Sequence, residues 1–203
     1  MTKLILEWRA AHPGVCVTPY ESGDRSLHAA LTDCQIDAAL VPDFLLHNYG
    51  TGSLVYSEPL MAVVPTSHRL ASQRDLRWRH LQTEILLLWA AGKGEACREF
   101  FAARLPCTSL RVFEADSLTV LAFVRIGYCI TISAGAYSTL NLYGLVFVPI
   151  VEENAHVDVS LTWRPESEDP VMGKFVAFIR DRTELYRRTP PSSVAFGNPD
   201  PSP

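Results

Sequence analysis

Residue types that support catalysis are present in this chain, but their spacing matches no catalytic motif. The six histidines are isolated from one another, so no HxH or HExxH pattern is available to hold zinc. The segment Gly92-Lys93-Gly94 lacks the upstream glycine and the hydroxyl residue of a nucleotide-binding P-loop. No serine has flanking glycines at the spacing of a hydrolase nucleophile elbow. The sequence therefore favours binding over catalysis and predicts no cofactor and no metal.

Paired carboxylates occur twice, at Glu152-Glu153 and at Glu166 with Glu168, and both pairs lie in turn-like segments. Side chains so close in sequence point in different directions, so neither pair forms a preorganised acid/base couple. We interpret both as solvated loop charge. A deaminase or transferase would remain an alternative if turnover were detected.

Three places combine a predicted helix N-terminus with small or polar residues. Free backbone N–H groups and the positive end of the helix dipole favour a carboxylate at such positions. Lys93 would add a positive charge there, and Trp89 would contact an apolar ligand body. The predicted ligand-binding residues are Ser22, Gly23 and Asp24, then Trp89, Gly92, Lys93 and Gly94, and finally Asp116 and Ser117.

Each of these residues also has a plainer interpretation. Ser22 and Asp116 would serve equally well as helix caps. Lys93 would be an ordinary solvated charge, and Trp89 a core residue. Asp24 would repel an anion unless it caps its helix.

Alternating strand-like and helix-like segments position these residues and indicate an α/β fold with largely parallel sheets covered on both faces. Apolar periodicity and capping signals predict the helices, and apolar runs between turn formers predict the strands. The predicted helices cover residues 4–11, 24–31, 95–104 and 117–126, and a last one starts at Asp169-Pro170. The predicted strands cover residues 15–20, 36–41, 84–89, 110–113, 129–133, 145–150 and 157–163, and residues 54–65 form two extended stretches bent around Glu58-Pro59.

The order of these segments predicts a chain that builds one lobe, leaves it, builds a second and returns. The predicted hinge residues are Pro59, Leu60, Pro149 and Ile150. Lobe I then comprises residues 1–59 and 151–188, and lobe II comprises residues 60–150. Residues 189–203 are rich in Pro and polar residues and are predicted to be a disordered tail. A ligand is expected in the crevice between the lobes.

Composition limits the class of partner. The chain has 203 residues, 48% of them apolar, and a net charge of −4, so it offers no excess of Lys and Arg for nucleic acid. Its N-terminus does not resemble an export signal, and no apolar run approaches the ~20 residues of a membrane span. Five widely spaced cysteines favour reduced thiols and a cytoplasmic location, with no membrane partner.

Five segments in order resemble the effector domain of LysR-type regulators. Residues 8–42 (WRAAHPGVCVTPYESGDRSLHAALTDCQIDAALVP) resemble its opening, including the "IDAA" strand. SEPLMAVVPTSHRLA (57–71) resembles the crossover between lobes, and EADSLTVLAFVRIGYCITISAG (114–135) a helix-Gly-strand segment of the second lobe, although the family usually has small residues at Arg125 and Tyr128. VFVPI (146–150) and VDVSLTWRP (157–165) resemble the return crossover and the last strand. In register with the opening are Pro13, Glu21, Gly23, Leu31, Ile36, Asp37 and Ala38.

This resemblance implies a two-lobed, periplasmic-binding-protein-like (type 2) α/β fold, with two subdomains joined by two crossover strands. It also implies a small-molecule inducer between the lobes, whose binding changes lobe closure and the packing of a homodimer or homotetramer. DNA would be bound only through a helix-turn-helix domain that is not in this chain.

The family's domain opens with a strand before the helix that here starts near Thr2, so we expect the first strand of lobe I to be missing. The chain would then be a fragment, or its first lobe would be completed in another way. The alternative function is a free-standing or exported solute-binding protein of the same fold. The lack of an export signal and the five cysteines speak against it.

Overall fold

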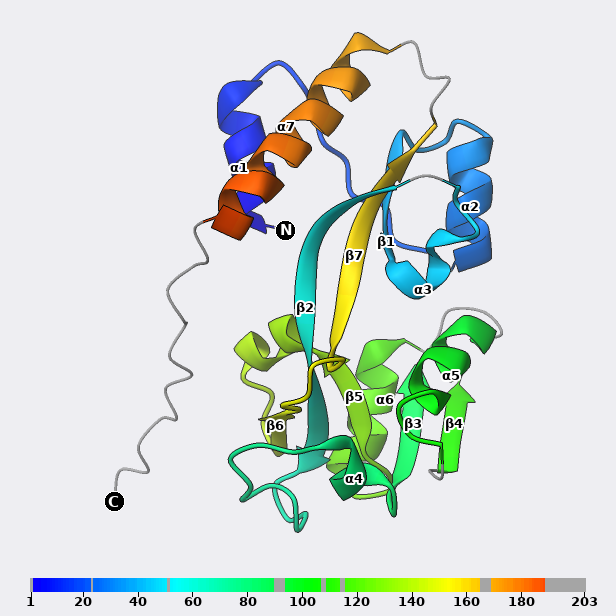
Figure 1. The fold of residues 1–203 in the computed structure, drawn as a ribbon, viewed down its shortest axis with the longest axis vertical. Helices are drawn as coiled ribbons and strands as arrows, with labels where there is room; N and C mark the ends of the chain where they lie inside the picture. The colour runs from blue at the N-terminus through cyan, green and yellow to red at the C-terminus, as the bar shows by residue number, and fades with distance from the viewer. Residues whose placement is uncertain are drawn as a thin grey trace. The chain divides into compact units, whose positions relative to one another are not determined.

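The computed structural model describes residues 2–22, 24–50, 52–89, 94–106, 109–113, 116–164 and 169–188, apart from the side chains of Thr2, Asp24, Arg25, Trp89 and residues 185–188. The chain divides into two compact units (Figure 1). The first unit combines residues 1–18 with residues 168–203, and the second comprises residues 19–167.

The first unit is a pair of helices, α1 (Thr2–Ala11) and α7 (Pro170–Arg188). Trp8 of α1 is buried, and its ring meets the edges of Phe175 and Phe178 at centroid distances of 5.0 and 5.4 Å. The predicted start of α7 is confirmed, because the Asp169 carboxylate accepts a hydrogen bond of 2.8 Å from the Val171 backbone N–H. Apolar helix faces therefore hold this unit together.

The second unit contains every strand of the described chain. Its elements, in order, are α2 (Asp24–Thr32), β1 (Ala38–Pro42), α3 (Asp43–Leu46), β2 (Gly52–Pro65), α4 (Trp78–Leu81), β3 (Ile85–Trp89), α5 (Glu95–Ala102), β4 (Ser109–Phe113), α6 (Ser117–Arg125), β5 (Thr131–Ala134), the 3-10 helix η1 (Gly135–Leu140), β6 (Leu145–Pro149) and β7 (His156–Trp163). Most of these lie within two residues of a predicted helix or strand. Helices α3 and α4 and the 3-10 helix η1 are elements that the sequence did not predict.

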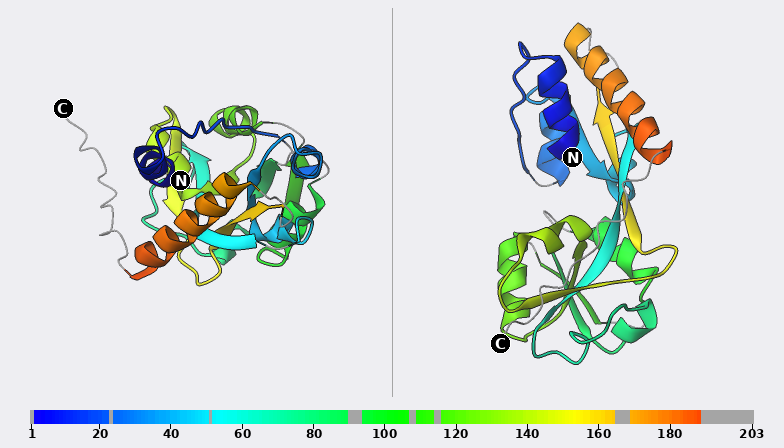
Figure 2. Two further views of the ribbon diagram at one scale, coloured as in Figure 1. Left: turned by 90° about the horizontal axis from the view of Figure 1, so that it is seen from above. Right: turned by 90° about the vertical axis from the view of Figure 1, so that its left-hand side faces the viewer.

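The long strand β2 belongs to two sheets. Its first half, Gly52–Pro59, pairs with β7, which in turn pairs with β1, and we call these three strands the first sheet. Its second half, from Leu60 to Pro65, pairs with β5 and β6. Figures 1 and 2 show β2 and β7 running side by side from the first sheet toward the second.

The second sheet contains the second half of β2 with β5, β6, β3 and β4. Strands β3 and β4 are parallel, and a parallel bridge from Leu86 to Ile130 connects β3 to the start of β5. Side chains from this sheet and from α4, α5 and α6 form two buried apolar clusters. The two-lobed α/β fold expected from the resemblance is thus present.

Three details of the sequence interpretation are wrong. The first sheet is antiparallel, because β2 and β7 cross between the sheets in opposite directions. β2 is one continuous strand through Pro59, and its irregularity is a register shift between Leu54 and Tyr56. Residues 15–20 form no strand; Val17 and Tyr20 are exposed, so pairing this segment would bury little apolar surface.

Candidate functional site

Three helix starts meet at one edge of the second sheet. Strands β3, β4 and β5 run parallel, and each leads at its carboxyl end into a helix, α5, α6 or η1 respectively. In open α/β sheets, ligands bind at this carboxyl edge. The edge is therefore the candidate binding site, and the predicted second-lobe residues that the structure describes, Trp89, Gly94, Asp116 and Ser117, belong to it.

At the start of α6, Asp116 acts as a helix cap. Its carboxylate accepts a hydrogen bond of 2.7 Å from the Thr119 backbone N–H, and this bond lowers the pKa of Asp116 below its usual value. The carboxylate is exposed and its charge is satisfied by the helix. Ser117, the next residue, points its hydroxyl toward Tyr137 of η1, with 3.5 Å between the two oxygens.

A small pocket opens beside Ser117. Its volume of about 10 Å³ has room for roughly one water molecule. The Thr131 hydroxyl donates to the Leu87 carbonyl at 2.6 Å, whereas Tyr137 and Ser117 place theirs at the pocket wall. The lining residues are Ser117, Val120, Leu121, Thr131, Ser133 and Tyr137. The arrangement suits a small hydrogen-bonding group next to an apolar one.

At the start of α5, Gly94 adopts a left-handed backbone conformation with φ of 65°, which favours glycine at this position. Trp89 ends β3, but its side chain is outside the described part of the structure, as are Gly92 and Lys93. The contribution of Lys93 therefore stays a prediction.

The predicted residues of the first lobe lie at the start of α2. Ser22 is half-buried, Gly23 is outside the described residues, and Asp24 is the first residue of the helix. No contact in the described structure links Ser22 to the pocket or to α5.

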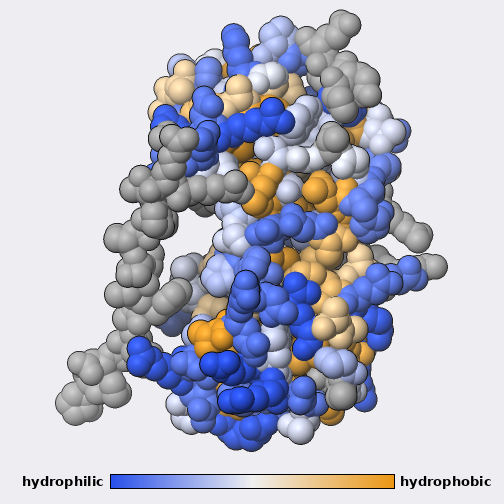
Figure 3. All heavy atoms as spheres, viewed as in Figure 1, coloured by the Kyte–Doolittle hydropathy of each residue, from blue (hydrophilic) through white to orange (hydrophobic). Residues whose placement is uncertain are grey.

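The element of the first sheet that does reach the second sheet is α3, which the sequence did not predict. Phe44 of α3 contacts Phe100 of α5, with ring centroids 4.8 Å apart. Figure 3 shows apolar surface gathered at the middle of the visible face, over α3 and α5. The sequence signal for α3 was Pro42-Asp43, which resembles a helix start. The residues after it are too few to show the apolar period of a helix.

Two carboxylates, Asp43 and Asp158, lie near each other at α3. Asp43 accepts a hydrogen bond of 3.3 Å from the Ser160 hydroxyl of β7. Burial, and then the nearby charge of Asp158, raise the pKa of Asp43 above its usual value. This part of the first sheet is therefore unfavourable for an anion.

The four predicted hinge residues lie together where the chain passes between the sheets. The Leu60 N–H donates to the Ala155 carbonyl at 2.9 Å, and the Leu60 carbonyl accepts from the Ile150 N–H at 3.1 Å. Pro149 pairs opposite the residue after Leu60. Pro59 packs on Gly135, where a Cβ atom would approach the Pro59 Cγ to 2.9 Å, so the crossing has no room for a side chain there.

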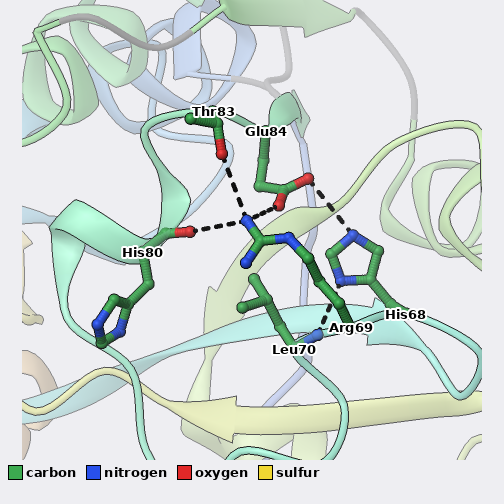
Figure 4. Close-up of polar contacts among 6 residues, drawn as sticks. All are labelled: His68, Arg69, Leu70, His80, Thr83 and Glu84. Atoms are coloured by element: carbon green, nitrogen blue, oxygen red, sulfur yellow. Dashed lines mark hydrogen bonds and ion pairs between the residues drawn. The ribbon is translucent and has the colours of Figure 1, made fainter.

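A separate polar cluster lies at the other edge of the second sheet, before β3 begins (Figure 4). Glu84 forms an ion pair with Arg69 and lies 3.4 Å from the His68 imidazole. The His68 Nδ1 accepts from the Leu70 N–H at 3.3 Å, and Arg69 also bonds Thr83 and the His80 carbonyl. With side chains only 14% and 21% exposed, Glu84 and His68 fix the turn after β2.

The described residues offer neither a metal site nor a membrane span. They contain no group of three or more His, Cys, Asp or Glu side chains placed to hold a metal ion. They also contain no helix that is long and apolar enough to cross a membrane.

Comparison with known proteins places this geometry in a family. The sequence model described as the LysR substrate binding domain matches residues 1–184. Two curated relatives come from Escherichia coli strain K12. The uncharacterised HTH-type transcriptional regulator YnfL is 24% identical over 79% of this chain and 56% of its own length. The Hca operon transcriptional activator HcaR is 20% identical over 63% of this chain and 45% of its own length. The chain thus spans about half the length of these relatives.

Solved structures share the fold. The effector-binding domain of BenM with its effector benzoate has a TM-score of 0.73 at 22% identity, covering 94% of this chain and 89% of that one. Full-length CbnR complexed with its target DNA has a TM-score of 0.77 at 19% identity, covering 90% and 66%. The reduced OxyR regulatory domain from Pseudomonas aeruginosa has a TM-score of 0.72 at 18% identity, covering 90% and 89%.

Proposed function

The chain belongs to the family of LysR substrate binding domains, and on that premise we propose that it is the inducer-sensing part of a cytoplasmic transcription regulator. The parent protein would bind DNA through a separate helix-turn-helix domain, as the HTH-type relative and the DNA complex of CbnR suggest. The observation that carries the proposal is the convergence of the α5, α6 and η1 starts at one sheet edge facing α3.

We propose a small carboxylate, aromatic in its body, as the inducer. Backbone N–H groups at the start of α5, with Lys93, would bind the carboxylate. The hydroxyls of Ser117 and Tyr137 would bind a second polar group. Asp43 and Asp158 repel an anion, so the carboxylate would point away from the first sheet. The benzoate bound by the BenM domain, which shares the fold, supports this ligand class.

A titration with benzoate and a panel of aromatic and aliphatic carboxylates tests this proposal. A ligand at one hundred times its Kd should stabilise the chain by about 2.7 kcal/mol, measured as a rise in melting temperature. Lys93→Ala should remove most of that rise, because the carboxylate loses its cation. The matched control is Lys174→Ala at an exposed position of α7, which should keep the full rise.

Two results would contradict the ligand proposal. One is a panel in which no carboxylate shifts the melting temperature while neutral or cationic analogues do. The other is an equal loss in Lys93→Ala and Lys174→Ala, which would attribute the effect to overall charge.

We also propose that the domain self-associates through the outer face of α6. Ile126 is 74% exposed and Tyr143, in the turn before β6, is 92% exposed. Such an apolar surface is typical of an interface. The other exposed apolar side chains of α6 and the turn after it are Leu118, Phe123 and Tyr128.

Sedimentation velocity of Ile126→Asp tests the surface. A charge at the centre of an apolar interface should convert a dimer or tetramer into a smaller species. Val171→Asp, an equally drastic change at an exposed position of α7, should leave the oligomer intact. An unchanged sedimentation coefficient in Ile126→Asp would reject this face as the interface.

A further inference from the structure

The short helix α3 is fixed to the first sheet. Its first residue, Asp43, accepts from Ser160 of β7, and the segment after it presents the Tyr49 carbonyl to the Thr162 hydroxyl at 3.5 Å. Both bonds go to the central strand of the first sheet. Phe44, which follows Asp43, therefore moves with that sheet.

Phe100 is fixed in the same way to the second sheet. It packs against the larger apolar cluster of that sheet, and the next residue, Phe101, is buried within it. The ring of Phe100 meets Phe44 at 4.8 Å with an interplanar angle of 40°, which is an ordinary attractive aromatic pair. This contact between two aromatic rings thus adds to the strands β2 and β7 in joining the two sheets.

Arg104 connects this contact to the crossing of the chain. Its guanidinium lies over the Phe100 ring, 3.5 Å from the centroid, and donates to the Phe100 carbonyl at 2.7 Å. Its Nε donates to the Asn154 carbonyl at 3.0 Å. A single side chain therefore contacts both the aromatic pair and the return crossing.

The segment that Arg104 reaches controls where the hinge begins. Asn154 also accepts a hydrogen bond of 2.7 Å from the Trp78 indole, so it is tied to the second sheet twice. The next residue, Ala155, accepts from the Leu60 N–H, and β7 starts one residue later. The part of the chain that is free to bend therefore lies on the first-sheet side of Leu60 and Ala155.

We infer that Phe44, Phe100 and Arg104 form a latch that holds the two sheets closed and couples this closure to the backbone at Leu60. Opening separates the two rings. Arg104 stays over Phe100, but that ring loses the support of Phe44, so the contact of Arg104 with the Asn154 carbonyl weakens and the Asn154 and Ala155 peptides become less constrained. The inference concerns the hinge and does not depend on the identity of the ligand proposed above.

Hydrogen exchange of the full chain without ligand tests the latch. Phe44→Ala should accelerate exchange of the Leu60 amide about threefold to tenfold, the factor expected for losing one aromatic pair. Arg104→Gln should accelerate the same amide, because it removes the bond to Asn154. The matched control is Phe178→Ala on α7, a half-buried phenylalanine that also loses one aromatic contact, to Trp8 at 5.4 Å, and should leave Leu60 unchanged.

The amides of Ala62 and Val63, in the buried half of β2, separate a latch from general destabilisation. If Phe44→Ala accelerates these amides as much as Leu60, the effect is global and the latch is rejected. The latch is equally rejected if Leu60 exchanges at the wild-type rate in both variants.

A cross-link gives the complementary result, because a covalent link takes the place of the packing between the two rings. Phe44→Cys with Phe100→Cys, in a background with Cys16, Cys34 and Cys107 changed to serine, should react with a short reducible cross-linker that joins two thiols, and this link should slow Leu60 exchange until it is reduced. Burial raises the pKa of Cys97, on the same helix, to about 11, so it stays a thiol at pH 8. A cross-link that forms but leaves Leu60 exchange unchanged would overturn the inference.

Discussion

The two halves of β2 are parts of one strand, yet they are embedded very differently. The half from Leu60 to Pro65 is buried at every residue and has a paired strand on each side, β5 and β6. The half from Gly52 to Pro59 alternates between exposed and covered residues, and in the described structure it pairs with β7 alone. The difference shows that the second sheet is a closed core and the first sheet a thinner layer attached to it.

This difference bears on how such a domain can respond to a ligand. A strand that is bonded on both edges cannot bend without breaking two ladders, whereas the half with one ladder bends at the loss of a few contacts. A relative motion of the sheets would therefore leave the second sheet intact. The change would be concentrated between Pro59 and Leu60 on the outward strand and at Ala155 on the return.

The largest effect that tests this comparison is on stability. Leu86→Ala removes a side chain with 0% exposure from the centre of the second sheet, so unfolding should become easier by about 2–5 kcal/mol. Leu40→Ala in β1 of the first sheet, where the leucine is only half-buried, should cost roughly 1–2 kcal/mol. Urea denaturation of both variants gives the two numbers.

Equal costs for the two leucines would break the comparison, because they would mean that the first sheet is as tightly packed as the second. A Leu86→Met variant, which conserves volume, should recover most of the loss and shows that the cost comes from the cavity.

Most elements could be predicted from the sequence because their signals are local. The Asp116 cap is confirmed, and α6 ends within one residue of its predicted end at 126. The sequence also indicated that the chain leaves the first sheet and later returns to it. Along β2, the change of pairing partner from β7 to β5 falls between Pro59 and Leu60. Such signals depend on neighbours in sequence and need no knowledge of partners in space.

The missed features depend on distant partners. The apolar alternation at residues 15–20 predicted a strand, but a strand exists only if another edge is there to pair with it, and the sequence does not say which. The direction of β7 relative to β1 was missed for the same reason. Helix α3 is four residues long, too short to show a helical period.

The candidate site was predictable in outline only. Asp116 and Ser117 were singled out because a helix start is a local feature. Tyr137 and Thr131 were not, because they reach the same pocket from η1 and β5, and only the fold brings those elements beside α6. Phe44 and Phe100 are 56 positions apart and carry no sequence signal of their contact.

A smaller effect on stability tests the comparison of the two sheets through a charged group. The first sheet keeps a carboxylate in an unfavourable place: burial, and then Asp158, raise the pKa of Asp43 above 3.8, against the opposing effects of Ser160 and His156. A raised pKa means that the folded protein binds this proton more tightly than the unfolded chain. The stability it contributes is therefore complete below about pH 3.8 and is lost as the pH rises through the raised value. Asp43→Asn should remove that loss and stabilise the protein at pH 7 by less than about 1 kcal/mol, since the group is largely accessible to solvent.

Melting temperatures of both proteins from pH 4 to pH 8 give the result, with Asp33→Asn at the exposed end of α2 as control. If Asp43→Asn is less stable than the wild type at pH 7, the carboxylate is a net stabiliser of α3.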